Sequence, residues 1–307
     1  MRATRNWVGP ISGNLAVVAA AFTTEPLLAI IEHLAGHAPC AITVVDPDLA
    51  PRGTYAGEVV EHGGLRFVHR PFRTWVDLAE RAGLRLLTPR ALEAPWVELR
   101  FERLDPAARL RPTHDDPTEK YGAASEFARV SKLEDPNFVL DLRDALDRVG
   151  PRARVLDLGV NTGDELALVT GGEIVGVDHS ASALAVARQR FPAARFIEGD
   201  LNALPALGRF DLVISLGTLQ SPGIDDRELL RRIVQDHLAP DGAVIIGFPN
   251  ARYVGGELEH GTRMVNYTQP EIGVLIKDVA FYRKYLQQHG RRVFVTGKYE
   301  VLVTAIG

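Results

Sequence analysis

The sequence of 307 residues has a single cysteine, Cys40, which excludes an intrachain disulfide and a metal site built from several cysteines. It also has no excess of positive charge, because 35 Lys and Arg stand against 39 Asp and Glu. That balance gives no general attraction to nucleic acid or to anionic membranes. The apolar stretch after Asn14 is too short to cross a bilayer, since polar residues and a proline interrupt it at 23–26. These absences predict a soluble, cytoplasmic protein with no nucleic-acid or membrane partner.

Three residues have a spacing that suits a metal ion, namely His33, His37 and Cys40. No fourth ligand lies near them in the sequence, and a structural zinc site usually needs four. We therefore predict no metal site.

The chain divides into two segments that differ in how regularly strand and helix patterns alternate. Residues 14–105 show a loose alternation of strand and helix patterns, and residues 105–117 form a run rich in proline and charge. We predict a small α/β module of unknown role over residues 1–112, with a substrate lid or a dimer surface as hypotheses. The second domain then covers residues 113–307 and begins with a partly helical approach segment, 118–150.

From Arg154 onward, short apolar strands alternate regularly with amphipathic helices. This pattern predicts a mostly parallel, doubly wound α/β sheet covered on both faces. The last two strands are separated only by Gly297 and Lys298, so they are expected to end the sheet as an antiparallel hairpin.

The most informative stretch is the loop after the first strand of this domain. Gly159 and Gly163 allow a close backbone approach, and Asn161 tolerates a positive φ. Asp157 precedes the turn and can accept a hydrogen bond from an ammonium group. A helix beginning near Thr162 is expected to point its amide dipoles at the same site.

Polar residues also follow the next three strands, at the edge where open α/β sheets bind ligands. Asp178 ends the second strand and can accept both hydroxyls of a ribose. The motif "EGDL" at 198–201 follows the third strand and can hold an exocyclic amine and a ring nitrogen. The motif "SLGTLQS" at 215–221 follows the fourth strand and forms a floor under a reacting group.

Together these motifs resemble the class I S-adenosylmethionine-dependent methyltransferases, from about residue 154 to the end of the chain. The family loop is typically an acid followed by G-x-G-x-G, and here Asn161 replaces the middle glycine. The resemblance implies S-adenosyl-L-methionine as the cofactor. The residues it implies for the cofactor site are Asp157, Gly159, Asn161, Gly163, Asp178, His179, Asp200, Leu201, Ser215 and Gly217.

Other functions fit the sequence less well. A nicotinamide or flavin enzyme is disfavoured because the loop lacks the G-x-G-x-x-G spacing and the chain ends in a hairpin. Methylation of adenine or glutamine amines is disfavoured because no Asn/Asp-Pro-Pro-Tyr motif follows the fourth strand. The absence of a cysteine from the second domain excludes the cysteine route to C5 of pyrimidines. An RNA or protein methyltransferase and a non-catalytic cofactor-binding scaffold stay open as alternatives.

The acceptor side is predicted from two segments. Residues 248–271 are dense in polar and aromatic side chains that could cap the site, although a solvated hairpin is the alternative interpretation. The candidate catalytic residues there are His260, Glu257 and Tyr253, and the candidate substrate contacts are Arg252, Arg263 and Tyr267. In the approach segment the candidate substrate contacts are Tyr121, Phe127 and Arg129, with packing of Phe127 on the core as the alternative. We therefore predict methyl transfer to an O, N or S nucleophile of a small molecule, with a homodimer as a further expectation.

Overall fold

The computed structural model describes residues 20–110, 115–261 and 272–307. The chain divides into two compact units, Met1–Ala108 and Arg109–Gly307. This division falls close to the boundary expected between residues 112 and 113. That the two units act as separate functional domains stays a prediction.

The first unit is built on a mixed sheet in the order β1-β2-β7-β5, with β6 also paired to β7. Only β1 and β2 are parallel, and the intervening helix α1 makes the crossover. The strand near residue 100 alternates in burial, because Leu99 and Phe101 are buried while Arg100 is exposed. The elements are β1 Ala20–Phe22, α1 Leu27–His37, β2 Cys40–Val45, β3 Val59–His62, β4 Leu65–Val68, α2 Phe72–Ala82, β5 Leu84–Leu86, β6 Arg90–Ala91 and β7 Trp96–Arg103.

Both helices of this unit contribute to one core. Ile30 and Leu34 of α1 and Trp75 of α2 are almost fully buried there, together with Ile42 of β2. The strands β3 and β4 form a separate antiparallel pair.

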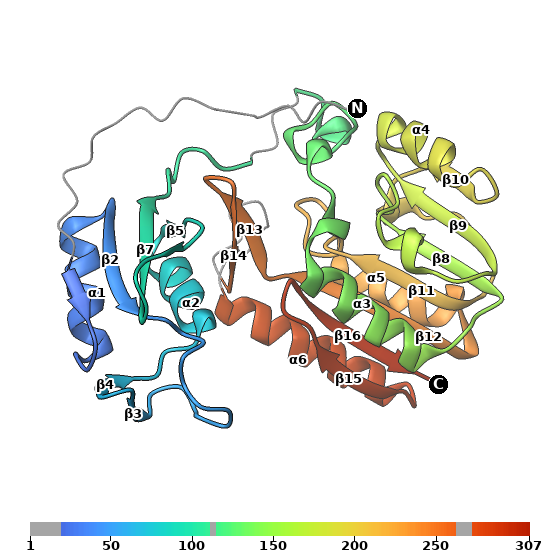
Figure 1. The fold of residues 1–307 in the computed structure, drawn as a ribbon. Helices are drawn as coiled ribbons and strands as arrows, with labels where there is room; N and C mark the ends of the chain where they lie inside the picture. Colours follow the sequence, from blue (N-terminus) through green and yellow to red (C-terminus); the bar gives the residue numbers. More distant parts are fainter. Residues whose placement is uncertain (1–19, 111–114, 262–271) are drawn as a thin grey trace, which may run out of the picture. The chain divides into compact units, whose positions relative to one another are not determined.

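The second unit contains a seven-stranded sheet in the order β10-β9-β8-β11-β12-β16-β15 (Figure 1). The first five strands of this order are parallel, and β16 runs antiparallel to both β12 and β15. The predicted doubly wound sheet and its terminal hairpin are therefore confirmed. The strands are β8 Arg154–Leu158, β9 Glu173–Asp178, β10 Arg195–Glu198, β11 Phe210–Leu216, β12 Leu238–Pro249, β15 Arg292–Thr296 and β16 Glu300–Ile306.

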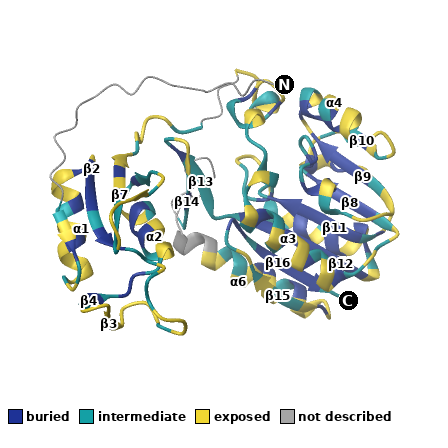
Figure 2. Cartoon of the chain, viewed as in Figure 1, coloured by how far each residue is buried: buried dark blue, intermediate teal, exposed yellow. Residues whose placement is uncertain are grey.

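Both faces of this sheet are covered, as the apolar strands require (Figure 2). Leu156 and Val303 face a core shared with α5 and α6, whereas Val155 and Leu302 face a core shared with α3. The helices of this unit are η1 Pro117–Glu119, η2 Glu126–Arg129, η3 Lys132–Glu134, α3 Pro136–Val149, η4 Glu165–Leu168, α4 Ala181–Arg190, η5 Leu201–Ala203, α5 Asp226–Arg232, the π-helix η6 Ile233–His237 and α6 Ile272–Gln288. Among the helices that the structure describes, none is long and apolar enough to cross a membrane.

The prediction of a helix beginning near Thr162 is wrong. Only a short 3-10 helix, η4, forms there, and it ends before Val169. Val169 and Thr170 are β-branched, and Gly171 and Gly172 follow with positive φ, so this sequence has little helix propensity. A helix dipole aimed at the glycine loop is therefore absent from this part of the described chain.

One close packing contact shapes the edge of the sheet. Gly176 in β9 lies directly opposite Phe196 in β10. A Cβ atom at position 176 would stand 2.8 Å from the Phe196 ring and 2.9 Å from Val160. Glycine is required here by packing rather than by its φ angle.

The terminal hairpin offers a matched test of burial. Val303 in β16 is fully buried, and its cross-strand partner Val295 in β15 is 43% exposed. Val303→Ala is expected to lower the free energy of unfolding by about 2 kcal/mol, because a cavity opens in the core. Val295→Ala should cost less than about 1 kcal/mol. Urea denaturation of both variants measures the difference, and equal losses would contradict the assigned burial of the two positions.

Candidate functional site

The loop after β8 adopts the left-handed backbone that its sequence predicts. Gly159 and Gly163 have φ angles of 80° and 79°, and Asn161 has φ 46°. The Asn161 side chain supports this conformation, because its Oδ1 accepts from the Thr162 amide at 2.8 Å and its Nδ2 donates to the Tyr121 carbonyl at 2.8 Å. Replacement of the middle glycine of the motif therefore preserves the turn and adds a contact with the approach segment.

Asp178 at the end of β9 braces two loops at once. Its Oδ2 accepts from the Asn161 amide at 2.9 Å, and its Oδ1 accepts from the Ser180 amide at 2.8 Å. The side chain is buried, yet each carboxylate oxygen can accept a further hydrogen bond. This geometry is compatible with the predicted bidentate contact to a ribose.

Asp157 lies one strand away, at the end of β8, and has no exposed surface. Apart from the Glu165 carboxyl, no described group forms a hydrogen bond with either of its carboxylate oxygens. Burial raises its pKa well above the ordinary value, the neighbouring Glu165 carboxylate raises it further, and Lys132 opposes both effects. A buried carboxylate in this state calls for a cationic or hydrogen-bond-donating partner, so the site fits the ammonium group of an amino-acid-like cofactor.

The remaining residues predicted for the adenine lie at the ends of β9 and β10. Asp200 is exposed and caps η5, because its Oδ1 accepts from the Asn202 amide at 2.9 Å. Leu201 is buried beside it, and His179 is exposed. Their contacts with a cofactor stay predictions.

The predicted floor after β11 is part of the sheet itself. The Ser215 hydroxyl is buried and donates to the Leu158 carbonyl at 3.0 Å, which ties β11 to β8. Gly217 has φ 68°, and its amide donates to the Gly247 carbonyl at 3.0 Å. The Ser215 side chain thus stabilises the sheet. A role for residues 215–217 beneath a reacting group stays a prediction.

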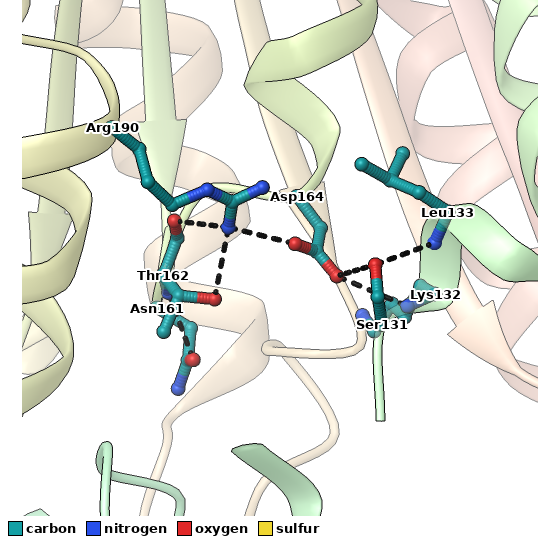
Figure 3. A network of polar contacts seen from close by, with 7 residues as sticks. All are labelled: Ser131, Lys132, Leu133, Asn161, Thr162, Asp164 and Arg190. Atoms are coloured by element: carbon teal, nitrogen blue, oxygen red, sulfur yellow. Dashed lines mark hydrogen bonds and ion pairs between the residues drawn. The ribbon is translucent and has the colours of Figure 1, made fainter. Parts of the chain in front are cut away.

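The approach segment is fastened to the glycine loop through Asp164 (Figure 3). The Oδ2 atom of Asp164 accepts from the Ser131 hydroxyl at 3.3 Å and from the Lys132 amide at 3.0 Å. Its Oδ1 atom accepts from Arg190 at 2.8 Å, and the same guanidinium donates to the Thr162 carbonyl at 2.8 Å. One carboxylate therefore joins the approach segment, the loop and α4.

A second attachment lies at the other end of the segment. The Glu119 carboxylate accepts from the Ser180 hydroxyl at 3.0 Å, from the Ser182 amide at 3.1 Å and from the Ser182 hydroxyl. These hydrogen bonds, with those from Ser182 foremost, hold the pKa of Glu119 below its ordinary value. The segment is thus attached on both sides of Tyr121.

The two aromatic candidates of the approach segment, Tyr121 and Phe127, lie next to each other, whereas Arg129 has a different partner. The rings of Tyr121 and Phe127 are 5.3 Å apart and both are half-buried. Burial raises the pKa of Tyr121. Arg129 is exposed and lies 3.9 Å from Glu126, as an ordinary surface pair would.

The predicted cap after β12 is an antiparallel hairpin of β13 Ala251–Val254 and β14 Glu257–His260. Arg252 is paired with Glu259 directly across this hairpin, at 2.9 Å and 3.0 Å. Glu257 is exposed at the start of β14, and His260 is half-buried at its end.

Two further candidates cannot be placed. Arg263 and Tyr267 lie outside the described residues. Their predicted substrate contacts stay predictions.

Tyr253 is the hairpin residue that reaches the loop region. Its hydroxyl bonds with that of Tyr299, and Lys132, Asp135 and Asp164 act on its charge from the approach segment and the loop. Burial is the main cause of the raised pKa of Tyr253, and it also raises the pKa of Tyr299. A neutral phenol is therefore the stable form, which suits a hydrogen-bond donor better than a proton acceptor.

The sequence interpretation missed three residues next to Asp157. Lys132 of η3 has its ammonium 3.5 Å from the Glu300 carboxylate, and Glu300 and Glu165 are both buried. Burial raises the pKa of Glu300 and raises that of Glu165 to about 7. The sequence offered one sign of these buried acids, which is the glutamate at the first position of the apolar strand 300–306.

No group of three or more His, Cys, Asp or Glu side chains in residues 20–110, 115–261 and 272–307 is arranged to hold a metal ion.

The raised pKa of Glu165 predicts a pH-dependent stability. The folded state binds the Glu165 proton more tightly than the unfolded chain does. The resulting contribution to the free energy of unfolding is therefore complete below about pH 4.5 and is lost as the pH rises to about 7. Glu165→Gln keeps a neutral side chain at every pH. It should match the wild type near pH 4 and exceed it at pH 8 by at most about 3 kcal/mol. Urea denaturation at both pH values tests this. A variant less stable than the wild type at pH 8 would contradict the claim that the ionised, buried Glu165 carboxylate destabilises the fold.

Comparison with known proteins agrees with this geometry. Residues 155–242 match a family model described as a methyltransferase domain. The trans-aconitate 2-methyltransferase of Delftia acidovorans is 32% identical over 168 residues, covering 48% of this chain and 61% of the relative. The enzyme of the same name from Azoarcus sp. is 34% identical over 113 residues, covering 35% of this chain and 44% of the relative.

The chain spans about half the length of the curated relatives it matches. Among solved structures, Streptomyces venezuelae DesVI is 19% identical with a TM-score of 0.43, covering 59% of this chain and 98% of DesVI. The matched domain begins at β8 and includes the loop, Asp178 and the strands on either side of them. Residues 155–242 therefore form a methyltransferase domain of the class I, S-adenosylmethionine-dependent type, whose cofactor is S-adenosyl-L-methionine.

Proposed function

We propose that this chain transfers a methyl group from S-adenosylmethionine to an O, N or S nucleophile of a small molecule. The observation that carries the proposal is the Asp157 carboxylate beneath the left-handed loop, which is fully buried and accepts no hydrogen bond from an amide, a hydroxyl or a basic side chain of the described residues. When bound, S-adenosylmethionine supplies an electrophilic methyl group on its sulfonium. Asp157 would hold its ammonium group, Asp178 its ribose, and Asp200 with Leu201 its adenine.

The chain's own residues would contribute mainly by position and by exclusion of water. The approach segment is attached to the loop through Asp164 and Glu119, which supports its predicted place over the cofactor. Tyr253 would donate a hydrogen bond to the acceptor from the hairpin. No proton acceptor is required unless the nucleophile carries a proton that it must lose.

A small molecule is favoured over RNA or protein by two observations. The chain has a formal net charge of −4 and so lacks the general attraction to phosphate that RNA-binding proteins use. The relatives it matches are named for a small acceptor, trans-aconitate. The cytoplasmic location and the homodimer stay predictions.

A non-catalytic scaffold is the second interpretation. It is less well supported, because the acids and the left-handed loop positions of the motif are intact. A scaffold would keep its partner binding when Asp178 is replaced, whereas an enzyme would lose cofactor and activity together.

Calorimetric titration tests the proposal directly. The wild type should bind S-adenosylmethionine and S-adenosylhomocysteine at micromolar concentration and bind neither NAD nor NADP. Asp178→Ala should weaken binding of both ligands by about 30- to 100-fold, because two loop amides and the ribose lose their charged acceptor. Asp236→Ala removes an exposed aspartate and serves as the matched control. Binding of a dinucleotide, or an unchanged affinity in Asp178→Ala, would contradict the assigned site.

A further inference from the structure

Three carboxylates converge beside the predicted cofactor loop, and we call them the carboxylate cluster: Asp157, Glu165 and Glu300. They come from the end of β8, from η4 and from the first position of β16. Each is less than 5% exposed. Burial is the largest cause of the raised pKa of all three, which is the expected result of removing carboxylates from water.

The charges within this cluster do not balance. Lys132 is the cation that the described structure places against it, 3.5 Å from Glu300 and close enough to act on Asp157 and Glu165. Three carboxylates face one ammonium group. Two further positive charges, or two protons, are needed to neutralise the ionised cluster.

The predicted cofactor supplies one of these charges. Asp157 lies beneath the glycine loop, and no amide, hydroxyl or basic side chain of the described residues donates to its two oxygens, so the ammonium group of S-adenosylmethionine fits there. Above about pH 7, where Glu165 is ionised, one negative charge then remains on the side of Glu165 and Glu300.

The two oxygens of Glu300 have different surroundings. Its Oε1 faces Lys132, while its Oε2 has no described hydrogen-bond partner. That second oxygen lies over Gly247 near the end of β12, where a Cβ atom would collide with it. In the sheet order, β12 is separated from β8 by β11, so this oxygen lies on the side expected for the acceptor.

The surroundings of Glu300 also suit a cation. Tyr299 precedes it and bonds with Tyr253, so two phenol rings lie close to Lys132. The Lys132 ammonium also lies 5.4 Å from the centroid of the Phe138 ring, so an aromatic face already contacts a cation here. The cluster reaches the surface at the Lys132 side chain, which is 35% exposed, and at the half-buried Tyr253.

We propose that the methyl acceptor is a small-molecule amine that binds as an ammonium ion against Glu300, which makes Glu300 the residue that selects the acceptor. This inference rests on the proposed function and adds the acceptor's chemical class. A carboxylate acceptor would meet like charges at this place and be repelled. The described arginines predicted to contact the acceptor are engaged elsewhere, Arg252 with Glu259 and Arg129 near Glu126.

The same residue would prepare the amine for methylation. An ammonium nitrogen has no free electron pair, so one N–H bond must break before the nitrogen can accept a methyl group. The proton would pass to the Glu300 carboxylate, forming an O–H bond and leaving a neutral amine with its lone pair. The proton would later pass from Glu300 to water, and the methylated product would leave as an ammonium ion.

Ligand-observed NMR with three probes of one shape tests the proposal on the full-length protein. The probes are benzylammonium, benzyl alcohol and benzoate, each titrated in the presence of saturating S-adenosylhomocysteine. The wild type should bind benzylammonium at least tenfold more tightly than benzyl alcohol, and benzoate more weakly still. Glu300→Gln should lose at least tenfold in benzylammonium affinity while its affinity for S-adenosylhomocysteine changes less than twofold.

Two further variants separate the possible outcomes. At pH 8, where Glu165 is ionised, Glu165→Gln should also weaken benzylammonium binding, and it provides a second test if Glu300→Gln does not fold. Glu102→Gln removes an exposed glutamate of β7 and should change nothing. Equal binding of benzylammonium and benzyl alcohol, tighter binding of benzoate, or full benzylammonium affinity in both Gln variants would overturn the amine proposal. Failure of the wild type to bind S-adenosylhomocysteine would instead overturn the proposed function.

Discussion

The burial of the Asp157 carboxylate at the end of the central strand is the constraint on which the site depends. A carboxylate removed from water is costly unless a positive charge accompanies it. In this protein the accompanying charge is Lys132, which belongs to the approach segment rather than to the sheet. The position of that segment is therefore part of the electrostatics of the sheet edge, and the contacts of Asp164 and Glu119 keep it in place.

Much of the fold could be predicted because it follows from local sequence. The nearly continuous apolar runs of the strands indicate a sheet covered on both faces, and the short connection at Gly297 and Lys298 indicates the terminal hairpin. The positive φ of Asn161 was equally accessible, since few other residue types adopt it. The family and its cofactor were recognised from the same local motifs and are confirmed.

The omission of Lys132, Glu165 and Glu300 has one physical cause. Lys132, Glu165 and Glu300 are far apart in the sequence, and only the tertiary fold brings them together. No periodicity in one segment reveals such a cluster. The helix expected near Thr162 does not form for a local reason, because β-branched residues and glycines follow η4 and end it after one turn. The pairing of Arg252 with Glu259 was predictable in principle, since the Gly255-Gly256 turn fixes which residues lie opposite each other.

The contact between Gly176 and Phe196 has a consequence for how this family can diverge. Because the obstacles at position 176 are the Phe196 ring and the Val160 side chain and not the backbone angle, positions 176 and 196 are linked by epistasis. A Gly176→Ala change should be harmful alone and better tolerated beside a smaller residue at position 196. Related chains are then expected to vary at these two sites together, as a covarying pair that reports the β9–β10 register without any structure.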